Sequence, residues 1–122
     1  MAEKNQYLNQ QLAKGTLLIN ENVLESIVIN AVKEIDGVAG FSSRPAKDMI
    51  NNIGKKNIGK SLVIYIDEDN QLHVNCSINL FYGENIINIT KNVQAAISDA
   101  LESTANAVVA SVNVNVFGIV RK

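Results

Sequence analysis

The C-terminal half of the chain restricts the possible folds most, because a strand, a long helix and a second strand follow one another there. Residues 72–82 and 108–120 alternate apolar and polar side chains, which is the period of a strand with one buried face. Between them, residues 83–106 carry an apolar stripe at helical spacing: Ile86, Ile89, Val93, Ile97, Ala100 and Leu101. A helix between two strands of one sheet favours a right-handed crossover, so we predict that these strands pair in parallel.

The preceding residues predict a strand, a first long helix and a hairpin. Residues 16–19 suit a strand, and Asn20 suits the N-cap of a helix that Gly37 ends. The apolar face of this helix comprises Val23, Leu24, Ile27, Val28, Ala31, Val32 and Ile35. Residues 37–41 suit a turn or a short strand, Pro45 begins a short helix to about residue 53, and residues 54–60 suit a loop. Strand-like residues 61–66 and 72–82 flank the turn-forming sequence DEDN, which predicts a β-hairpin.

Together these segments predict an α+β fold, a two-layer sandwich in which a mixed β-sheet carries the two longer helices on one face. We assign residues 15–122 to a single domain, because a chain of 122 residues closes one core. Residues 1–14 are rich in Asn and Gln and weakly patterned. We therefore expect a flexible N-terminal arm, with a helix that forms on a partner as the alternative.

Composition narrows the class of protein. With 47% hydrophobic and 19% charged residues and a formal net charge of −1, the chain is typical of a globular protein without a general attraction to nucleic acid or membranes. No apolar run reaches the roughly 18 residues that span a bilayer, so we expect membrane association only through a partner. The single Cys76 excludes an internal disulfide, which favours a reducing cytoplasm.

Residues 54–61 read GKKNIGKS and match the phosphate-binding pattern G-x-x-x-x-G-K-[ST]. In a phosphate-binding loop a strand precedes this pattern and a helix follows it, with the helix N-terminus facing the phosphates. Here the residues that follow are β-branched and alternating, which favours a strand. A nucleotide-binding enzyme is therefore an alternative hypothesis and not the leading one.

Basic residues gather around the same segment. This basic patch comprises Arg44, Lys47, Lys55, Lys56 and Lys60, and only Asp48 opposes it. Such a patch can contact anionic lipid headgroups, an acidic protein or RNA through weak, salt-sensitive contacts. An RNA-binding module, with Phe81 or Phe117 as stacking groups, is thus a further alternative. A solvated loop kept soluble by its lysines is the simpler interpretation.

We predict no catalytic, cofactor-binding or metal site. His73 and Cys76 are three positions apart, so in a strand they lie on opposite faces and form no nucleophile pair. Cys76 falls among apolar residues and suits the core, whereas His73 suits the surface. Asp67, Glu68 and Asp69 lie in the predicted hairpin turn and lack the ligand pattern of a calcium-binding loop.

The sheet face turned away from the helices, hereafter the outer face, carries no Asp, Glu, Lys or Arg in the last two strands. We expect Ala110, Val112, Val114 and Val116 to face the helices. The outer face then displays His73, Asn75, Ser77, Asn79 and Phe81 from one strand and Ser111, Asn113, Asn115, Phe117 and Ile119 from the other.

Uncharged sheet faces are typical of interfaces, because long charged side chains normally protect a solvated face from association. Amides supply hydrogen bonds and aromatic rings supply apolar anchors. We therefore predict an interaction face of Asn75, Asn79, Phe81, Asn113, Asn115 and Phe117. A neutral but exposed face is the alternative.

Four stretches carry a family resemblance: residues 15–41, 74–86, 92–102 and 108–120. They contain a Gly-led first strand, a Gly-Val-x-Gly step after the first helix, a Tyr-Gly pair before the long helix and a Val-Asn-Val strand ending in Gly-Ile. In this order they resemble the alkaline shock protein family, small cytoplasmic proteins common in Gram-positive bacteria. Residues 42–61 coincide with the variable middle of that family, so the resemblance does not support the basic patch.

The resemblance implies a non-enzymatic protein that is linked to cell-envelope stress or homeostasis. It also implies self-association and attachment to the membrane through a separate anchor protein. It supplies no catalytic residues. Our leading hypothesis is therefore a cytoplasmic, self-associating interaction protein, with nucleotide binding and RNA binding as the alternatives.

Overall fold

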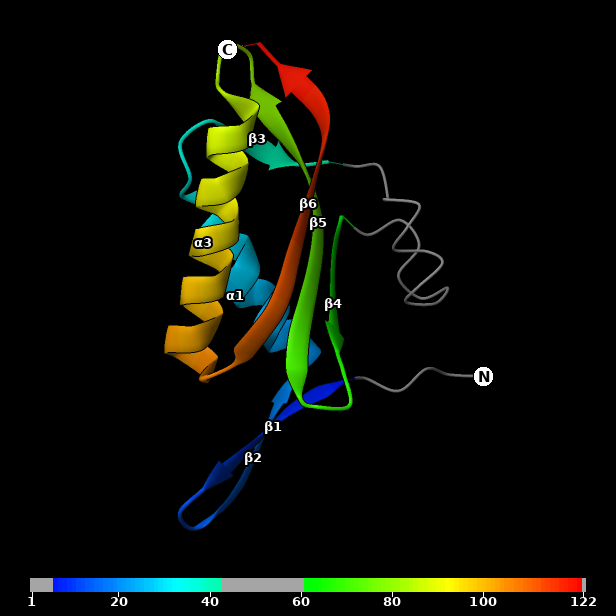
Figure 1. Ribbon diagram of the computed structural model, residues 1–122, viewed down its shortest axis with the longest axis vertical. Helices are drawn as coiled ribbons and strands as arrows, with labels where there is room; N and C mark the ends of the chain where they lie inside the picture. Colours follow the sequence, from blue (N-terminus) through cyan, green and yellow to red (C-terminus); the bar gives the residue numbers. More distant parts are fainter. Residues whose placement is uncertain (1–5, 43–60, 122) are drawn as a thin grey trace, which may run out of the picture.

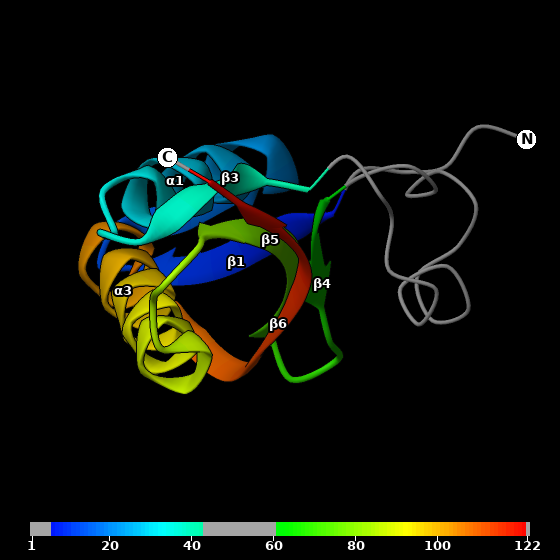
Figure 2. The ribbon, with the colours of Figure 1, turned by 90° about the horizontal axis from the view of Figure 1, so that it is seen from above.

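The computed structural model describes residues 6–42 and 61–121. In chain order these form β1 (Tyr7–Leu12), β2 (Gly15–Asn20), α1 (Glu21–Lys33), β3 (Val38–Phe41), β4 (Leu62–Ile66), β5 (Gln71–Phe81), α3 (Ile86–Ala105) and β6 (Val108–Val120). α1 and α3 lie side by side against one face of a mixed sheet (Figure 1, Figure 2). The predicted α+β sandwich is confirmed. The short helix predicted from Pro45 lies outside the described residues.

β5 is the central strand of the main sheet. Its first half pairs antiparallel with β4 and its second half antiparallel with β3, so these two strands share one edge of β5 end to end. Along the other edge β6 pairs with β5 in parallel, from Gln71 opposite Val108 to Phe81 opposite Val120. This confirms the parallel pairing predicted from the helical crossover and the hairpin predicted at DEDN.

The core lies between the two helices and the inner face of the sheet. α1 buries Leu24, Val28 and Val32, and α3 buries Ile89, Val93, Ile97, Leu101 and Ala105. These four-residue steps confirm the predicted helical stripes except at the start of each helix, where Val23 is 50% exposed and Ile86 is 47% exposed. α1 ends at Lys33, earlier than predicted, and Gly37 adopts its positive φ in the turn before β3.

An irregularity near the start of β6 corrects one predicted orientation. Between Val109 and Ser111 the register with β5 shifts, so Ala110 is the extra residue of a bulge. We expected Ala110 to face the helices, but it is exposed and lies outside the core. Past the bulge the alternation resumes, and Val112, Val114 and Val116 pack against the core as predicted.

A second irregularity near the end of β6 corrects another orientation. The register shifts at Phe117, so Gly118 and not Phe117 lies opposite Asn79. Ile119, which we placed on the outer face, lies opposite the core residue Leu80. One inserted residue inverts the alternation. Residues beyond the bulge therefore lie on the opposite sheet face from the one that strict alternation predicts.

The N-terminal segment forms a strand where we expected a flexible arm, so that expectation is wrong for Tyr7–Leu12. β1 and β2 form an antiparallel hairpin, and Leu8 of β1 is fully buried in the core. The hairpin lies at the lower end of the main sheet, with its turn projecting beyond the sheet (Figure 1).

Side-chain amides attach this segment to the rest of the fold. The Gln6 amide donates from Nε2 to the carbonyl oxygen of Ile64 at 2.8 Å and accepts from the N–H of Ile66 at 2.8 Å. It therefore extends the edge of β4 as the backbone of a neighbouring strand would. Gln10 donates from Nε2 to the carbonyl oxygen of Ala105 at 2.8 Å, at the C-terminal end of α3. The amide residues that suggested an irregular arm are the groups that hold it in place.

We predict that Gln6→Ala lowers the free energy of unfolding by about 1–3 kcal/mol, because an N–H and a carbonyl group of β4 lose their partner. Urea unfolding followed by circular dichroism measures this change. Gln11→Ala is the matched control, since Gln11 lies on the adjoining strand β1 and is exposed; its effect should stay within about 0.5 kcal/mol. Equal losses in the two variants would contradict the role of Gln6.

Candidate functional site

The outer face brings together the predicted interaction residues of β5 and β6. Asn75 lies opposite Asn113, whose Nδ2 donates to Asn75 Oδ1 at 3.0 Å. Asn115 lies opposite Ser77, and its Nδ2 donates to the carbonyl oxygen of Cys76 at 3.4 Å. Asparagine side chains on both strands thus engage in hydrogen bonds across this parallel pair.

Glycine residues flank the next asparagine of this face. Asn79 lies opposite Gly40 of β3 on one side and Gly118 of β6 on the other. A Cβ atom at Gly118 would lie 2.6 Å from Asn79 Oδ1, so glycine leaves the room that the amide needs. Phe81 occupies the last pair of the ladder. Phe117, the extra residue of the second bulge, is the predicted interaction residue that falls outside the regular register.

The outer face is only partly open to solvent. Val63 of β4 lies opposite Asn75 on this face, yet only 1% of it is exposed. Ser77 is fully buried, and its hydroxyl group makes no hydrogen bond in the described structure. Asn113 on β6, by contrast, is exposed. At this level of the sheet, the accessible side of the outer face is the β6 side.

His73 links the β4–β5 turn to β6. Its Nε2 lies 2.7 Å from Asp67 Oδ2, and its Nδ1 lies 2.9 Å from Ser111 Oγ. The Tyr65 ring lies beside the imidazole, with ring centroids 5.8 Å apart. We predicted a surface position for His73 and a position in the hairpin turn, without a ligand, for Asp67. Both side chains are partly exposed, but each has a specific partner that the sequence did not reveal.

Asp67 is held by the backbone of its own turn. Its Oδ1 accepts hydrogen bonds from the N–H groups of Asp69 at 2.9 Å and Gln71 at 3.0 Å. The hydrogen bond from Gln71 first, and then that from His73, lower the pKa of the Asp67 carboxyl group. An ionised carboxylate, an imidazole and the Ser111 hydroxyl therefore form one chain of hydrogen bonds. Serine hydrolases use these three groups in the same order.

Cys76 is separate from this chain. It is fully buried in the core, on the other face of β5 from His73, as predicted. Burial raises the pKa of its thiol to about 12. The thiol therefore stays protonated near neutral pH and is a poor nucleophile.

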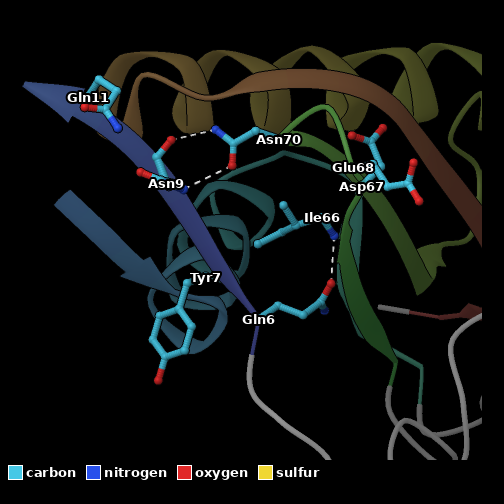
Figure 3. A pocket seen from close by; sticks show the side chains of 8 residues that line it. All are labelled: Gln6, Tyr7, Asn9, Gln11, Ile66, Asp67, Glu68 and Asn70. Carbon is cyan, nitrogen blue, oxygen red and sulfur yellow. Dashed lines mark hydrogen bonds between the residues drawn. The ribbon is translucent and has the colours of Figure 1, made fainter. Parts of the chain in front are cut away.

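A polar cleft of about 510 Å³ lies between β1 and the β4–β5 turn (Figure 3). It is lined by Gln6, Tyr7, Asn9, Gln11, Ile66, Asp67, Glu68 and Asn70. Asn70 closes one end of the cleft: its Nδ2 donates to the Asn9 carbonyl oxygen at 2.7 Å, and its Oδ1 accepts from the Asn9 N–H at 3.0 Å. Since Gln6 and Asn70 already bond to backbone, these amides join two parts of the fold. The cleft could not be predicted from the sequence, because residues 1–14 were expected to form a flexible arm and not the strand β1 that lines it.

The basic patch, comprising Arg44, Lys47, Lys55, Lys56 and Lys60, lies outside the described residues and stays a prediction. The RNA-binding alternative, which needs this patch, stays untested with it. The segment GKKNIGKS leads directly into β4, the strand that we predicted after it. A phosphate-binding loop opens a helix at this point, so the nucleotide-binding alternative loses its scaffold.

The helices of residues 6–42 and 61–121 are too short or too polar to cross a membrane. In the same two ranges, no three His, Cys, Asp or Glu side chains are grouped so that they could hold a metal ion.

Comparison with known proteins shows a family match over nearly the whole chain. Residues 9–121 match the alkaline shock protein 23 family, described as having a cell envelope-related function, which confirms the resemblance seen in the sequence. The match begins inside the segment that we had assigned to an arm.

Individual relatives cover similar lengths. The uncharacterized protein Spy1535 of Streptococcus pyogenes is 27% identical over 87% of this chain and 80% of its own. The uncharacterized protein Spy1614 of the same organism is 30% identical over 86% of this chain and 88% of its own. The uncharacterized protein YloU of Bacillus subtilis is 27% identical over 86% and 88%, respectively. No solved structure matches the chain.

We predict that Asp67→Asn destabilises the protein at neutral pH and that the destabilisation disappears in acid. Because folding lowers the pKa of Asp67 from its ordinary value of 3.8, the ionised group stabilises the fold above that value. This contribution is lost as the pH falls through the lowered pKa. Urea unfolding of both proteins from neutral pH down to about pH 2 measures the difference.

Glu68→Gln is the matched control, because it removes an exposed carboxylate from the same turn. Its effect at neutral pH should be the smaller of the two. A difference between wild type and Asp67→Asn that stays constant with pH would exclude the proposed role of the carboxylate.

Proposed function

We propose that this chain, which belongs to the alkaline shock protein 23 family with its cell envelope-related function, acts without catalysis as a cytoplasmic protein that binds copies of itself and a protein partner. Its role lies in envelope homeostasis or the response to envelope stress. Contact with the membrane runs through a separate anchor protein and not through a segment of its own.

The observation that carries this proposal is the chemistry of the outer face. β4 adds Val63 and Tyr65 to the outer face. With these two residues included, the outer face carries no Asp, Glu, Lys or Arg on β4, β5 or β6. Charged side chains on a sheet normally oppose association, both by their hydration and by like-charge repulsion. A face without them favours contact with another protein.

The asparagine side chains provide the specificity of such a contact. An amide offers both donors and an acceptor, so one asparagine can satisfy another without an unpaired charge. Asn75 and Asn113 already do this within the chain. The same amide pairing between two chains costs less desolvation free energy than an ion pair. Asn113 is exposed and could form such a pair with a second chain.

We predict that Asn113→Lys weakens self-association about tenfold or more, because the contact must then desolvate a charge or place it against its copy. Light scattering across a wide range of protein concentration measures the mass. Asn92→Lys is the matched control: it makes the same change at an exposed position on α3, in the other layer, and should leave association unchanged. A wild-type mass that stays monomeric at every concentration would exclude self-association.

A second candidate function, acyl transfer, rests on the hydrogen-bonded chain of Asp67, His73 and Ser111. In a hydrolase the imidazole takes the proton of the serine hydroxyl as the oxygen attacks an acyl carbon. Catalysis also needs N–H donors aimed at the developing oxyanion. Ser111 directly follows the bulge at Ala110 and lies opposite His73 in the β5–β6 ladder. The backbone N–H groups of ladder residues are directed along the sheet and not toward its face. We therefore favour a structural role, in which His73 ties the turn to β6.

A fluorophosphonate probe separates the two functions, since it labels a serine that a histidine activates. We predict no labelling of the wild-type protein beyond that of Ser111→Ala. Labelling that disappears in both Ser111→Ala and His73→Ala would favour the enzyme and contradict the non-catalytic role.

A further inference from the structure

One edge of β6 forms no ladder with any other described strand. Within the described structure this strand pairs with β5 alone, although it runs from Val108 to Val120. It contains no charged residue and no proline, which are two of the devices that protect a strand edge from pairing. A free edge of this composition is suited to a strand from another chain.

Hydrogen bonds elsewhere in the sheet show which groups face this edge. The Ser77 N–H donates to the Ser61 carbonyl oxygen and the Ser77 carbonyl oxygen accepts from the Ser42 N–H, both at 2.8 Å. Both Ser77 groups therefore point toward β3 and β4, and by alternation those of Cys76 point toward β6. In a parallel pair the residue opposite such a position directs its own groups away. Val114, opposite Cys76, thus presents its N–H and carbonyl to the free edge.

The sequence at this edge reads the same in both directions. Residues 112–116 are Val-Asn-Val-Asn-Val, a palindrome centred on Val114. In an antiparallel pair, residues on the two strands run in opposite order, so a palindrome places identical residue types opposite each other. Two copies of this segment therefore match valine with valine toward the helices and asparagine with asparagine on the outer face.

We propose that two copies of the chain pair along β6, antiparallel and about a two-fold axis at Val114, so that their sheets become one. In this arrangement Val112 lies opposite Val116 of the second copy, and Asn113 lies opposite Asn115 of the second copy. The inference rests on the self-association proposed above and assigns its geometry. The occupant of the free edge is the same strand of a second copy.

Three features of the chain limit this pairing to the middle of the palindrome. The bulges at Ala110 and Phe117 bend the strand on either side of it. Gln94 of α3 donates from Nε2 to the Val112 carbonyl oxygen at 3.0 Å, so it occupies one acceptor at the end of the segment. The central Val114 and its asparagine neighbours are thus the positions where two strands meet most closely.

Disulfide trapping tests this register with two single-substitution chains, Asn113→Cys and Asn115→Cys. Opposed residues of a non-hydrogen-bonded antiparallel pair have Cα atoms about 4.5 Å apart, within the range of a disulfide. An equimolar mixture should form several-fold more cross-linked dimer than either variant alone, because position 113 meets position 115 and not itself. Wild-type protein is the control, since burial protects its Cys76 thiol.

The outcomes separate this inference from the proposed function. Cross-linking that is as strong in one variant alone as in the mixture would overturn the register. A dimer seen by light scattering without any cross-linking in the mixture would overturn pairing through β6 and leave self-association standing. A protein that never dimerises would overturn both.

A charge pair provides a second test that needs no thiol. Asn113→Lys combined with Asn115→Lys places like charges opposite each other and should weaken the dimer at least about tenfold. Asn113→Lys combined with Asn115→Glu places opposite charges in register and should restore most of that loss. Equal weakening by the two pairs would contradict the proposed alignment.

Discussion

The parallel ladder between β5 and β6 is the interaction on which the rest of the fold depends. It requires a long connection, which α3 provides, and it places α3 over the inner face where the core forms. Because β3 and β4 already share the opposite edge of β5, β6 becomes the outermost strand. One pairing thus determines the position of the core, the helical layer and the unpaired edge.

Most of the fold could be predicted from periodicity, because burial of one face imposes a repeat on each element. Ile89, Val93 and Ile97 repeat every four residues, and Val112 and Val114 alternate with Asn113. The bulges could not be predicted, because a bulge leaves no signal in the amino-acid composition of the strand. It only shifts the pairing of the residues that follow it. The β1 strand could not be predicted either, because Gln6, directly before it, bonds to Ile64 and Ile66, far away along the chain.

Part of the candidate site could likewise be predicted from the sequence, and part of it could not. The alternation of β5 and β6 predicted the asparagines of the outer face, and the pairs formed by Asn113 and Asn115 follow from their register. The partners of His73 come from a turn and from a strand beyond α3, so no local pattern brings Asp67 and Ser111 together. Residues that are close through the β5–β6 ladder are separated in sequence by the whole of α3, and only the register reveals them.

The two-fold contact that we propose through β6 would also limit which larger assemblies can form. Among the described residues each copy has a single β6 edge of this kind, so the proposed pairing would occupy it and give a closed dimer. Residues that lie opposite each other in one sheet point to the same side, so the dimer joins two outer faces into a single uncharged surface. Any larger assembly, or a protein partner, must then use a different surface. The joined outer face is the candidate, because it is uncharged in each copy and becomes broad when both copies contribute to it. Self-association would thereby precede partner binding and control it.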